Sequence, residues 1–187
     1  LLHGANAIGG LVNIVTDVIP TKRVERTEGA VQADFGSAAS EAATSADVSV
    51  GDGRFAFHAG GSGRRSGDVD TPQGTIENSQ SRSGFGHVGA SLVTDKGFFG
   101  GAYQYDNTKY GIPIVEDGNI QLTPRRHSVS ARAESRGLNG PISSVRASFG
   151  VRRYRHDELE GEEIGTRFKN DTRSEEHTSE LQSQFHL

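Results

Sequence analysis

Cysteine, methionine and tryptophan are absent from the chain, and only 33% of its residues are hydrophobic. The absence of cysteine excludes a disulfide scaffold and any cysteine-based zinc site. No apolar run reaches the roughly 18 residues of a membrane-spanning helix, so a transmembrane helix is excluded as well. The formal net charge is −4, and without a basic excess we expect no nucleic-acid partner. What the sequence has instead is 25 glycines and a regular alternation of apolar and polar residues.

This alternation has a period of two residues, which places successive side chains on opposite faces of a β-strand. Val31, Ala33 and Phe35, for example, share one face. An all-β fold follows, and a membrane β-barrel explains the low apolar content because only alternate residues contact lipid. A tilted membrane-spanning strand needs about ten residues, and the alternating segments recur at residues 31–35, 44–50, 54–59, 87–92, 99–105, 128–134, 145–152 and 164–170.

The connections between these segments alternate in length. Short ones, rich in residues that tolerate hairpin geometry, occupy 51–53, 94–97 and 136–141, and longer polar ones occupy 63–83, 106–122 and 156–163. The short connection at 36–40 breaks this alternation. Short turns at one end and long loops at the other are typical of outer-membrane barrels, but a soluble β-sandwich or β-helix also uses short alternating strands. In a barrel, the aromatic girdle would come from Phe99, Tyr103, Tyr105, Phe149 and Tyr154.

The first residues differ in character from the rest. Residues 1–16 are glycine-rich and then almost continuously apolar, which indicates a tight turn followed by a buried strand. Residues 17–26 follow as a linker into the first alternating segment. Gly4 and Gly9 have the spacing of a phosphate-binding loop, but Gly10 and Leu11 stand where that loop needs Lys and Ser or Thr. We therefore expect no nucleotide binding.

Residues 2–16 resemble the end of the plug domain of TonB-dependent outer-membrane receptors. In that family a Leu-Tyr-Gly triplet leads through Ala-Ile-Gly-Gly to an apolar strand that ends in Asn, Ile, Val or Ile, and Thr. His3 stands where the family usually has tyrosine. Two later stretches resemble early barrel strands and loops of the same family, namely residues 97–100 with 110–113 and residues 158–161 with 165–170.

The resemblance implies a division of the chain. Residues 1–20 would be the C-terminal end of a plug domain, and residues 21–172 would be the N-terminal part of the barrel. That part holds seven or eight strands of a barrel of about 22. By the same resemblance, the full-length protein is a monomeric receptor in the outer membrane of a Gram-negative bacterium. It would actively take up a scarce nutrient such as a ferric siderophore or another metal chelate. Its expected partners are outer-membrane lipid, the nutrient ligand and the TonB complex, which contacts a segment upstream of Leu1.

The last residues have a different origin. Residues 173–183 correspond codon by codon to a translated short-read sequencing adapter, and residues 184–187 fit the adapter's variable index region. We therefore expect residues 173–187 to be an adapter-derived artefact. Leu1 opens inside a motif, so we expect that the chain is cut at both ends.

Histidines and carboxylates are the candidates for metal binding. The histidines at 58, 87, 127 and 156 are dispersed, and we interpret them as hydrogen-bonding residues of a barrel wall. The absence of histidine from residues 106–122 counts against zinc as the substrate. Acidic side chains could bind a cation through carboxylate oxygens, but we interpret the following as solvated loop residues: Asp157, Glu158, Glu160, Glu162 and Glu163, with Asp68, Asp70 and Glu77. No catalytic, cofactor-binding, metal-binding or ligand-contacting residue is assigned, and no enzymatic activity or cofactor is expected.

Other functions remain open at this point. A plug-less porin or small outer-membrane β-barrel would explain the strands but not residues 1–16. An outer-membrane lipase or protease would need a catalytic set on the barrel wall, and paired carboxylates alone do not make a glycosidase site. A secreted β-rich adhesin would show repeats in place of alternating long and short loops.

Overall fold

The computed structural model describes residues 18–113, 119–138, 142–161 and 163–181. Within these ranges the chain is all-β, and no helix is long and apolar enough to cross a membrane. The family-like motif at residues 2–16 lies outside them, as do Glu162 and residues 182–187. The strands are β1 (Glu28–Gly36), β2 (Glu41–Gly51), β3 (Phe55–Ser66), β4 (Val69–Thr71), β5 (Gly74–Ile76), β6 (Ser81–Thr94), β7 (Gly97–Gly111), β8 (Ile120–Arg136), β9 (Ile142–Glu160) and β10 (Glu163–Leu181).

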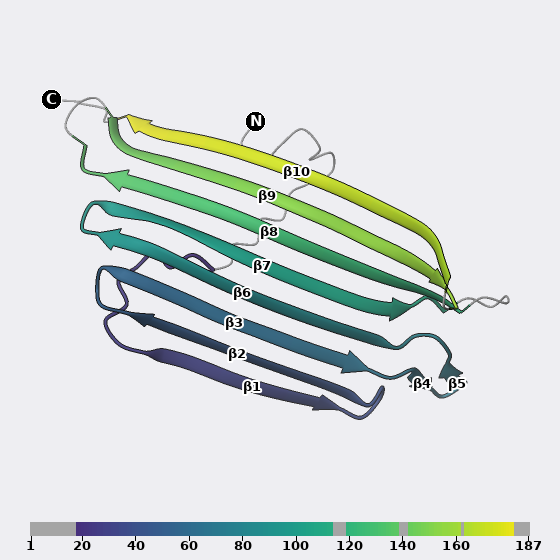
Figure 1. The fold of residues 1–187 in the computed structure, drawn as a ribbon. Coiled ribbons are helices and arrows are strands. Elements are labelled where there is room, and N and C mark those ends of the chain that lie inside the picture. The colour runs from purple at the N-terminus through teal and green to yellow at the C-terminus, as the bar shows by residue number, and fades with distance from the viewer. Residues whose placement is uncertain (1–17, 114–118, 139–141, 162, 182–187) are drawn as a thin grey trace, which may run out of the picture.

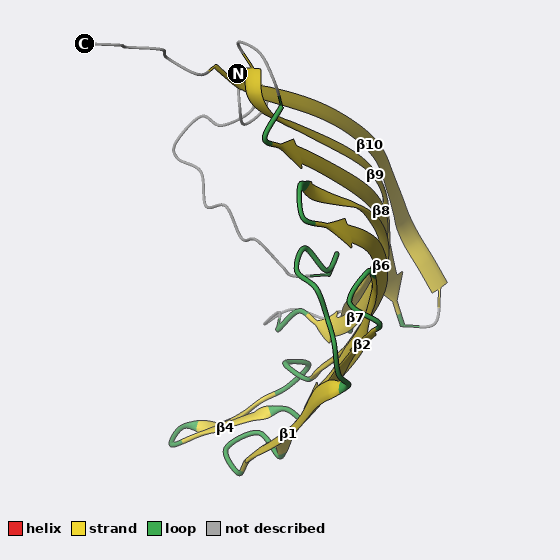
Figure 2. Ribbon diagram, turned by 90° about the vertical axis from the view of Figure 1, so that its left-hand side faces the viewer, coloured by secondary structure: helices red, strands yellow, loops and turns green. Residues whose placement is uncertain are grey.

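The strands form one large antiparallel meander (Figure 1). Its eight strands follow the order β1-β2-β3-β6-β7-β8-β9-β10, and β4 pairs with β5 in a separate hairpin. Every segment in which the sequence alternates became a strand of the large sheet, so the all-β prediction is confirmed. Among the described residues, β1 and β10 each pair on one side only. The sheet curves strongly along this order, and Figure 2 shows it edge-on with a concave and a convex face.

The later strands of the large sheet are longer than the expected ten residues. β7, β8, β9 and β10 span 15, 17, 19 and 19 residues. The prediction was too short because it followed apolar alternation, whereas backbone pairing continues equally well through polar residues. The expected long loop at 156–163 is wrong for this reason. β9 and β10 pair up to Glu160 opposite Glu163, with a tight turn at Gly161.

The other connections are closer to the prediction. The segment at 63–83 is long and contains the β4–β5 hairpin, while the loop expected at 106–122 narrows to residues 112–119. The turns after β2, β6 and β8, which were predicted to be short, stand at the opposite end of the sheet, and one of them places Gly97 at φ 150°. The short turns after β1 and β9 share the end of the long connections. A Cβ there would lie 1.8 Å from the backbone oxygen of Glu134. Glycine is therefore required at this turn, both by its φ and by the close approach of β8.

β10 continues past Arg173 to Leu181 and pairs with β9 over that length. This pairing joins backbone N–H and C=O groups, which every non-proline residue provides. It does not distinguish a natural strand from an appended one, so the adapter origin of residues 173–187 stays a prediction.

The small core lies at the centre of the concave face. The linker, residues 18–27, has no strand or helix and runs across this face toward β1. Val18 and Ile19 are buried there against Ala102 and Phe98. Further along, Arg23 pairs with Asp95 in a short turn at 2.7 Å. The linker is thus attached to the strand surface that it crosses.

Candidate functional site

The two faces of the sheet have opposite chemistry. On the convex face, large apolar side chains stand in the open, and Val31, Val88 and Phe99 are 83%, 55% and 65% exposed. The alternation and the register of the strands place other apolar residues on the same face: Phe35, Val48, Val50, Phe55, Phe57, Tyr103, Val129, Val145, Phe149 and Val151. These residues are the apolar band.

The apolar band crosses the strands diagonally. Register connects Ala33, in the middle of the apolar residues of β1, to Thr44, Gly63, Gly84, Asn107, Arg125 and finally Arg155 of β9. The apolar residues of β9, however, lie between Val145 and Val151. The centre of the band therefore shifts by about seven residues between β1 and β9, or roughly one residue for each strand crossed.

Aromatic side chains mark the border of the band toward the long connections. The Tyr103 hydroxyl lies 2.7 Å from Nδ1 of His127, and the rings of Tyr105 and His127 are 4.7 Å apart. Phe99, Tyr103, Tyr105 and Phe149 all stand on the convex face, as a girdle requires. Tyr154 does not, because its neighbour Arg153 takes the convex position opposite His127.

Tyr154 belongs to a cluster on the concave face. Its ring lies 5.7 Å from that of His156, which stacks on Phe168 at 5.3 Å. Phe168 reaches this face because a register shift between Ile164 and Thr166 moves the later residues of β10 to the other side. The sequence pattern cannot show a β-bulge of this kind, and the assignment of Tyr154 to the girdle was wrong.

Away from the linker contact and these aromatic rings, the concave face is mostly polar. Ser49 and His58 share a hydrogen bond of 2.8 Å, and the rings of His58 and His87 stack at 4.8 Å. Neither ring nitrogen of His87 has a hydrogen-bond partner among the described residues. Sequence spacing suggested dispersed histidines, but β3 and β6 bring these two together. His58 is hydrogen-bonded as expected, and its place in a barrel wall stays a prediction.

Several acidic residues proposed for loops have structural partners. Asp157 lies on β9, not in a loop, and its carboxylate pairs with Arg167 at 2.6 Å and Arg155 at 3.2 Å. Glu158, Glu160 and Glu163 also lie on strands. Within the described parts of the chain, no group of three or more His, Cys, Asp or Glu could hold a metal ion.

The carboxylates of the first long connection hold its backbone. Asp68 accepts hydrogen bonds from the amides of Ser79 and Gln80 at 2.8 and 3.0 Å. Asp70 accepts one from the Thr75 hydroxyl at 2.7 Å. These two side chains therefore order the β4–β5 hairpin, which is a more specific role than the solvated one expected. Glu77 follows β5 in the same segment.

Sequence reasoning missed a group of cations on the convex face, beyond the aromatic border. These residues are the basic strip: Arg65, Arg82, Lys109, Arg125, Arg155 and Lys169. Individually they look like scattered surface charges, and only the register of β3 to β10 gathers them at one level. Alternation by itself would have placed all of them except Lys169 on the apolar face of their strands, which is the signal that could have found them. Lys169 reaches this face only through the register shift between Ile164 and Thr166.

No known family model matches the chain.

Proposed function

We propose that this chain is part of the wall of an outer-membrane β-barrel, in a TonB-dependent receptor that takes up a scarce nutrient such as a ferric siderophore or another metal chelate. The observation that carries the proposal is the diagonal apolar band on the convex face. Its side chains would face lipid, and the polar concave face would line the lumen.

The exposed band needs a nonpolar environment. Leaving a Val or Phe side chain in water forgoes about 1.5–3 kcal/mol relative to burial, and the whole apolar band is exposed. A second layer of protein could cover the apolar band. A layer aligned with the strands, however, would not require the centre of the band to shift by about one residue from each strand to the next. A membrane does require it. Strands about 4.8 Å apart and tilted by about 40° cross a flat slab with a slip of roughly 1.2 residues per strand.

The linker supports a plugged barrel over an open one. Val18 and Ile19 pack on the concave face, so the chain enters the first strand from the lumen side. Residues 2–16, immediately before the linker, carry the resemblance to the end of a plug. A plug-less porin or small barrel accounts for the apolar band but gives no reason for a buried lumen-side linker, and it remains the second candidate.

The proposal assigns the surfaces to partners. The convex face contacts outer-membrane lipid, the lumen side holds the plug, and the TonB complex acts through a segment upstream of residue 1. The nutrient would bind at the lumen and the long-connection end. No residue of this chain is assigned to it.

Sequencing the source locus with long reads through both ends of this chain tests the proposal directly. We expect a reading frame that extends upstream into a complete plug and, in place of residues 173–187, downstream into further alternating strands. An upstream region without a plug would favour the porin. If genomic DNA encoded residues 173–187 followed by a stop codon, the adapter assignment and the large barrel would both be refuted.

A further inference from the structure

We infer that the basic strip binds the phosphate groups of lipid headgroups in the outer leaflet. The inference rests on the proposed membrane orientation of the sheet. It adds a ligand, and a surface for it, on the side of the wall that faces away from the lumen.

The first argument is the unusual placement of like charges. Arg65 stands directly opposite Arg82, and Arg82 directly opposite Lys109. A second row places Arg125 opposite Arg155 and Arg155 opposite Lys169. Like charges directly opposite one another destabilise a β-ladder. An arrangement repeated over two rows of neighbouring strands therefore calls for an anion that sits between the strands.

The protein supplies few such anions. Arg65, Arg82, Lys109 and Arg125 are exposed and form no ion pair with any carboxylate in the part of the chain that the structure describes. The nearest acidic residues by register are Asp157 and Asp171. Arg155 and Arg167 already occupy the two oxygens of Asp157, and Asp171 pairs with Arg153 at 3.5 Å. Most of the basic strip is therefore uncompensated by protein charge.

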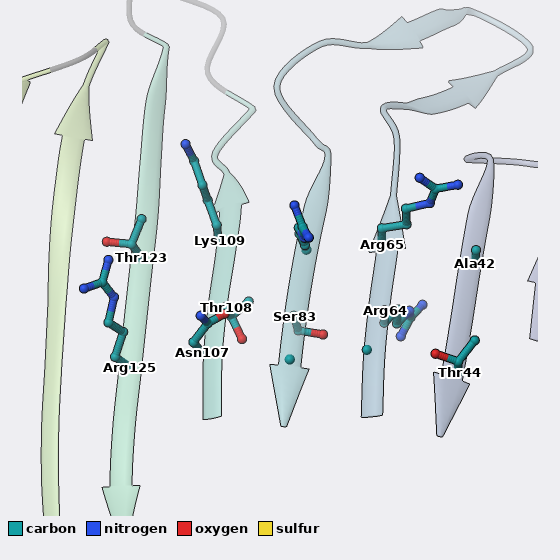
Figure 3. A pocket seen from close by; sticks show the side chains of 13 residues that line it. Ala42, Thr44, Arg64, Arg65, Ser83, Asn107, Thr108, Lys109, Thr123 and Arg125 are labelled. Carbon is teal, nitrogen blue, oxygen red and sulfur yellow. The ribbon is translucent and has the colours of Figure 1, made fainter. Parts of the chain in front are cut away.

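The second argument is the shape of the surface around these cations. A groove of about 660 Å³ runs across β2, β3, β6, β7 and β8 at this end of the sheet (Figure 3). Its floor contains Gly63 and Gly84, which oppose each other. A Cβ on Gly84 would meet nothing within 4 Å. The rim carries Arg65, Lys109 and Arg125, seen in Figure 3 on separate strands.

The rim also provides neutral donors. Asn107 lies on the same strand as Lys109, and Thr123 on the same strand as Arg125, and both line the groove. Guanidinium groups, an ammonium group, an amide and a hydroxyl together match the oxygens of a phosphate group. The glycine floor leaves room for the headgroup that carries it.

The position of the groove selects lipid as the source of the phosphate. The basic strip lies on the convex face, beyond Tyr105 and His127 at the border of the apolar band. It is at the long-connection end, which is extracellular in barrels of this type. A lipid whose chains lie along the apolar band therefore brings its headgroup to this level, whereas a nutrient in the lumen lies behind the sheet.

The test compares two double variants in the complete receptor recovered from the source locus. The first, Arg82→Gln with Lys109→Gln, removes two opposed cations of the basic strip. The control, Arg132→Gln with Arg152→Gln, removes the same charge from the concave face of β8 and β9. Each protein is reconstituted in phosphatidylcholine vesicles with and without a minor share of phosphatidic acid. The partitioning of a fluorescent phosphatidic acid next to the protein is measured by energy transfer.

A cation near an anionic lipid surface contributes about a fivefold preference, so loss of the pair lowers the preference for phosphatidic acid roughly 30-fold. The control leaves it within about twofold. Resistance to urea gives an independent readout, because the effect of the first variant on stability should reverse between the two lipid compositions. The first variant is more resistant to urea than wild type in pure phosphatidylcholine, because the like-charge repulsion is gone and the phosphate of that lipid is already neutralised by its own choline group. It is less resistant than wild type when phosphatidic acid, with its net negative charge, is present.

Three outcomes overturn the inference. If the two double variants prefer phosphatidic acid equally, the basic strip is not the binding site. A urea effect of the same sign in both lipids indicates a structural role only. Displacement of the labelled lipid by millimolar inorganic phosphate would identify a site for free anions instead of headgroups. Each of these leaves the apolar band untouched, so failure here is distinguishable from failure of the membrane assignment, which the arginine scan described below tests.

Discussion

An arginine placed on the convex face of β8 should destabilise the protein by an amount that depends on its depth. Ala131 lies near the centre of the apolar band, opposite Gly101 on β7 and Phe149 on β9. If lipid covers this face, Ala131→Arg places a charge at the bilayer midplane, at a cost of about 2–4 kcal/mol. The same substitution nearer either interface costs only about 0–1 kcal/mol.

The geometry of β8 sets the scale of the depth profile. Ser135 is on the same face as Ala131, and four residues span about 13 Å along a strand, or roughly 10 Å in depth at a tilt of about 40°. That distance is close to half of an apolar band about 25 Å tall, so Ser135→Arg should cost about 0–1 kcal/mol. Toward the other end, the native Arg125 lies roughly 15 Å from the midplane by the same conversion and falls outside the band. The wild-type sequence agrees with the profile.

The measurement is urea-induced unfolding of the full-length protein from phosphatidylcholine vesicles, extrapolated to zero denaturant. Ser130→Arg is the matched control. It neighbours Ala131 on the concave face, beside a cavity of about 480 Å³ with room for the new side chain. We expect its free energy of unfolding to change by less than about 1 kcal/mol.

Two results would refute the reasoning. A flat profile, with equal costs for arginine at 131 and 135, would mean that no slab of fixed thickness covers the convex face. If Ser130→Arg lowered the free energy of unfolding more than Ala131→Arg, the concave face that carries the linker would be the buried face, and the convex face would be the one in water. Either result removes the membrane assignment and leaves a soluble layered β protein as the better explanation.

Three further predictions concern the concave face and the loops. Gly89→Val should lower the free energy of unfolding by about 1–3 kcal/mol, because a Cβ there would lie 1.9 Å from the backbone oxygen of Val18. As the control, Gly84→Ala on the open convex face should be neutral or slightly stabilising. Asn78 has φ 58° and donates to two backbone carbonyls beyond β7 at 2.8 and 2.9 Å, so Asn78→Gly keeps the backbone unstrained but should lose about 1 kcal/mol in the same assay. Hydrogen bonds from the backbone amides of Phe55 and Arg54 lower the pKa of the Asp52 carboxyl below its ordinary value of 3.8. The stability that the ionised carboxylate contributes is present above that pH and is lost as the pH falls through the lowered pKa. Urea unfolding of Asp52→Ala should therefore show a shallower loss of stability on acidification than wild type, and an unchanged pH dependence would contradict this.

The sequence predicted the strands and their faces better than it predicted their ends. Val31, Val88 and Val129 were placed on the correct faces because the period of two follows directly from strand geometry. The lengths were underestimated because β9 continues through polar residues whose alternation carries no hydrophobic signal. The turn at Gly161 could not be recognised for the same reason, since the charged residues around it look like a loop.

The candidate surfaces were less accessible to sequence reasoning than the fold. The contact of His58 with His87 depends on the register of β3 against β6, which no local pattern fixes. The basic strip likewise needs the register of several strands, because each of its cations is unremarkable in its own segment. The position of Phe168 depends on a β-bulge, and one inserted residue reverses the face of everything after it. Long-range pairing was therefore the missing information in each case.

The packing of Val18 and Ile19 on the concave face of the sheet has a mechanical consequence. Residues 20–27 lead from there to β1, so the covalent connection enters at an edge of the sheet, while the packed contact lies at its middle, on Gly89 of β6 and Gly100 of β7. A tension applied to the chain before Val18 is therefore borne first by the centre of the sheet. Once that contact is pulled out, the ion pair of Arg23 with Asp95 and the hydrogen bond from the Gly53 amide to the Val24 carbonyl carry the load next, before it reaches β1.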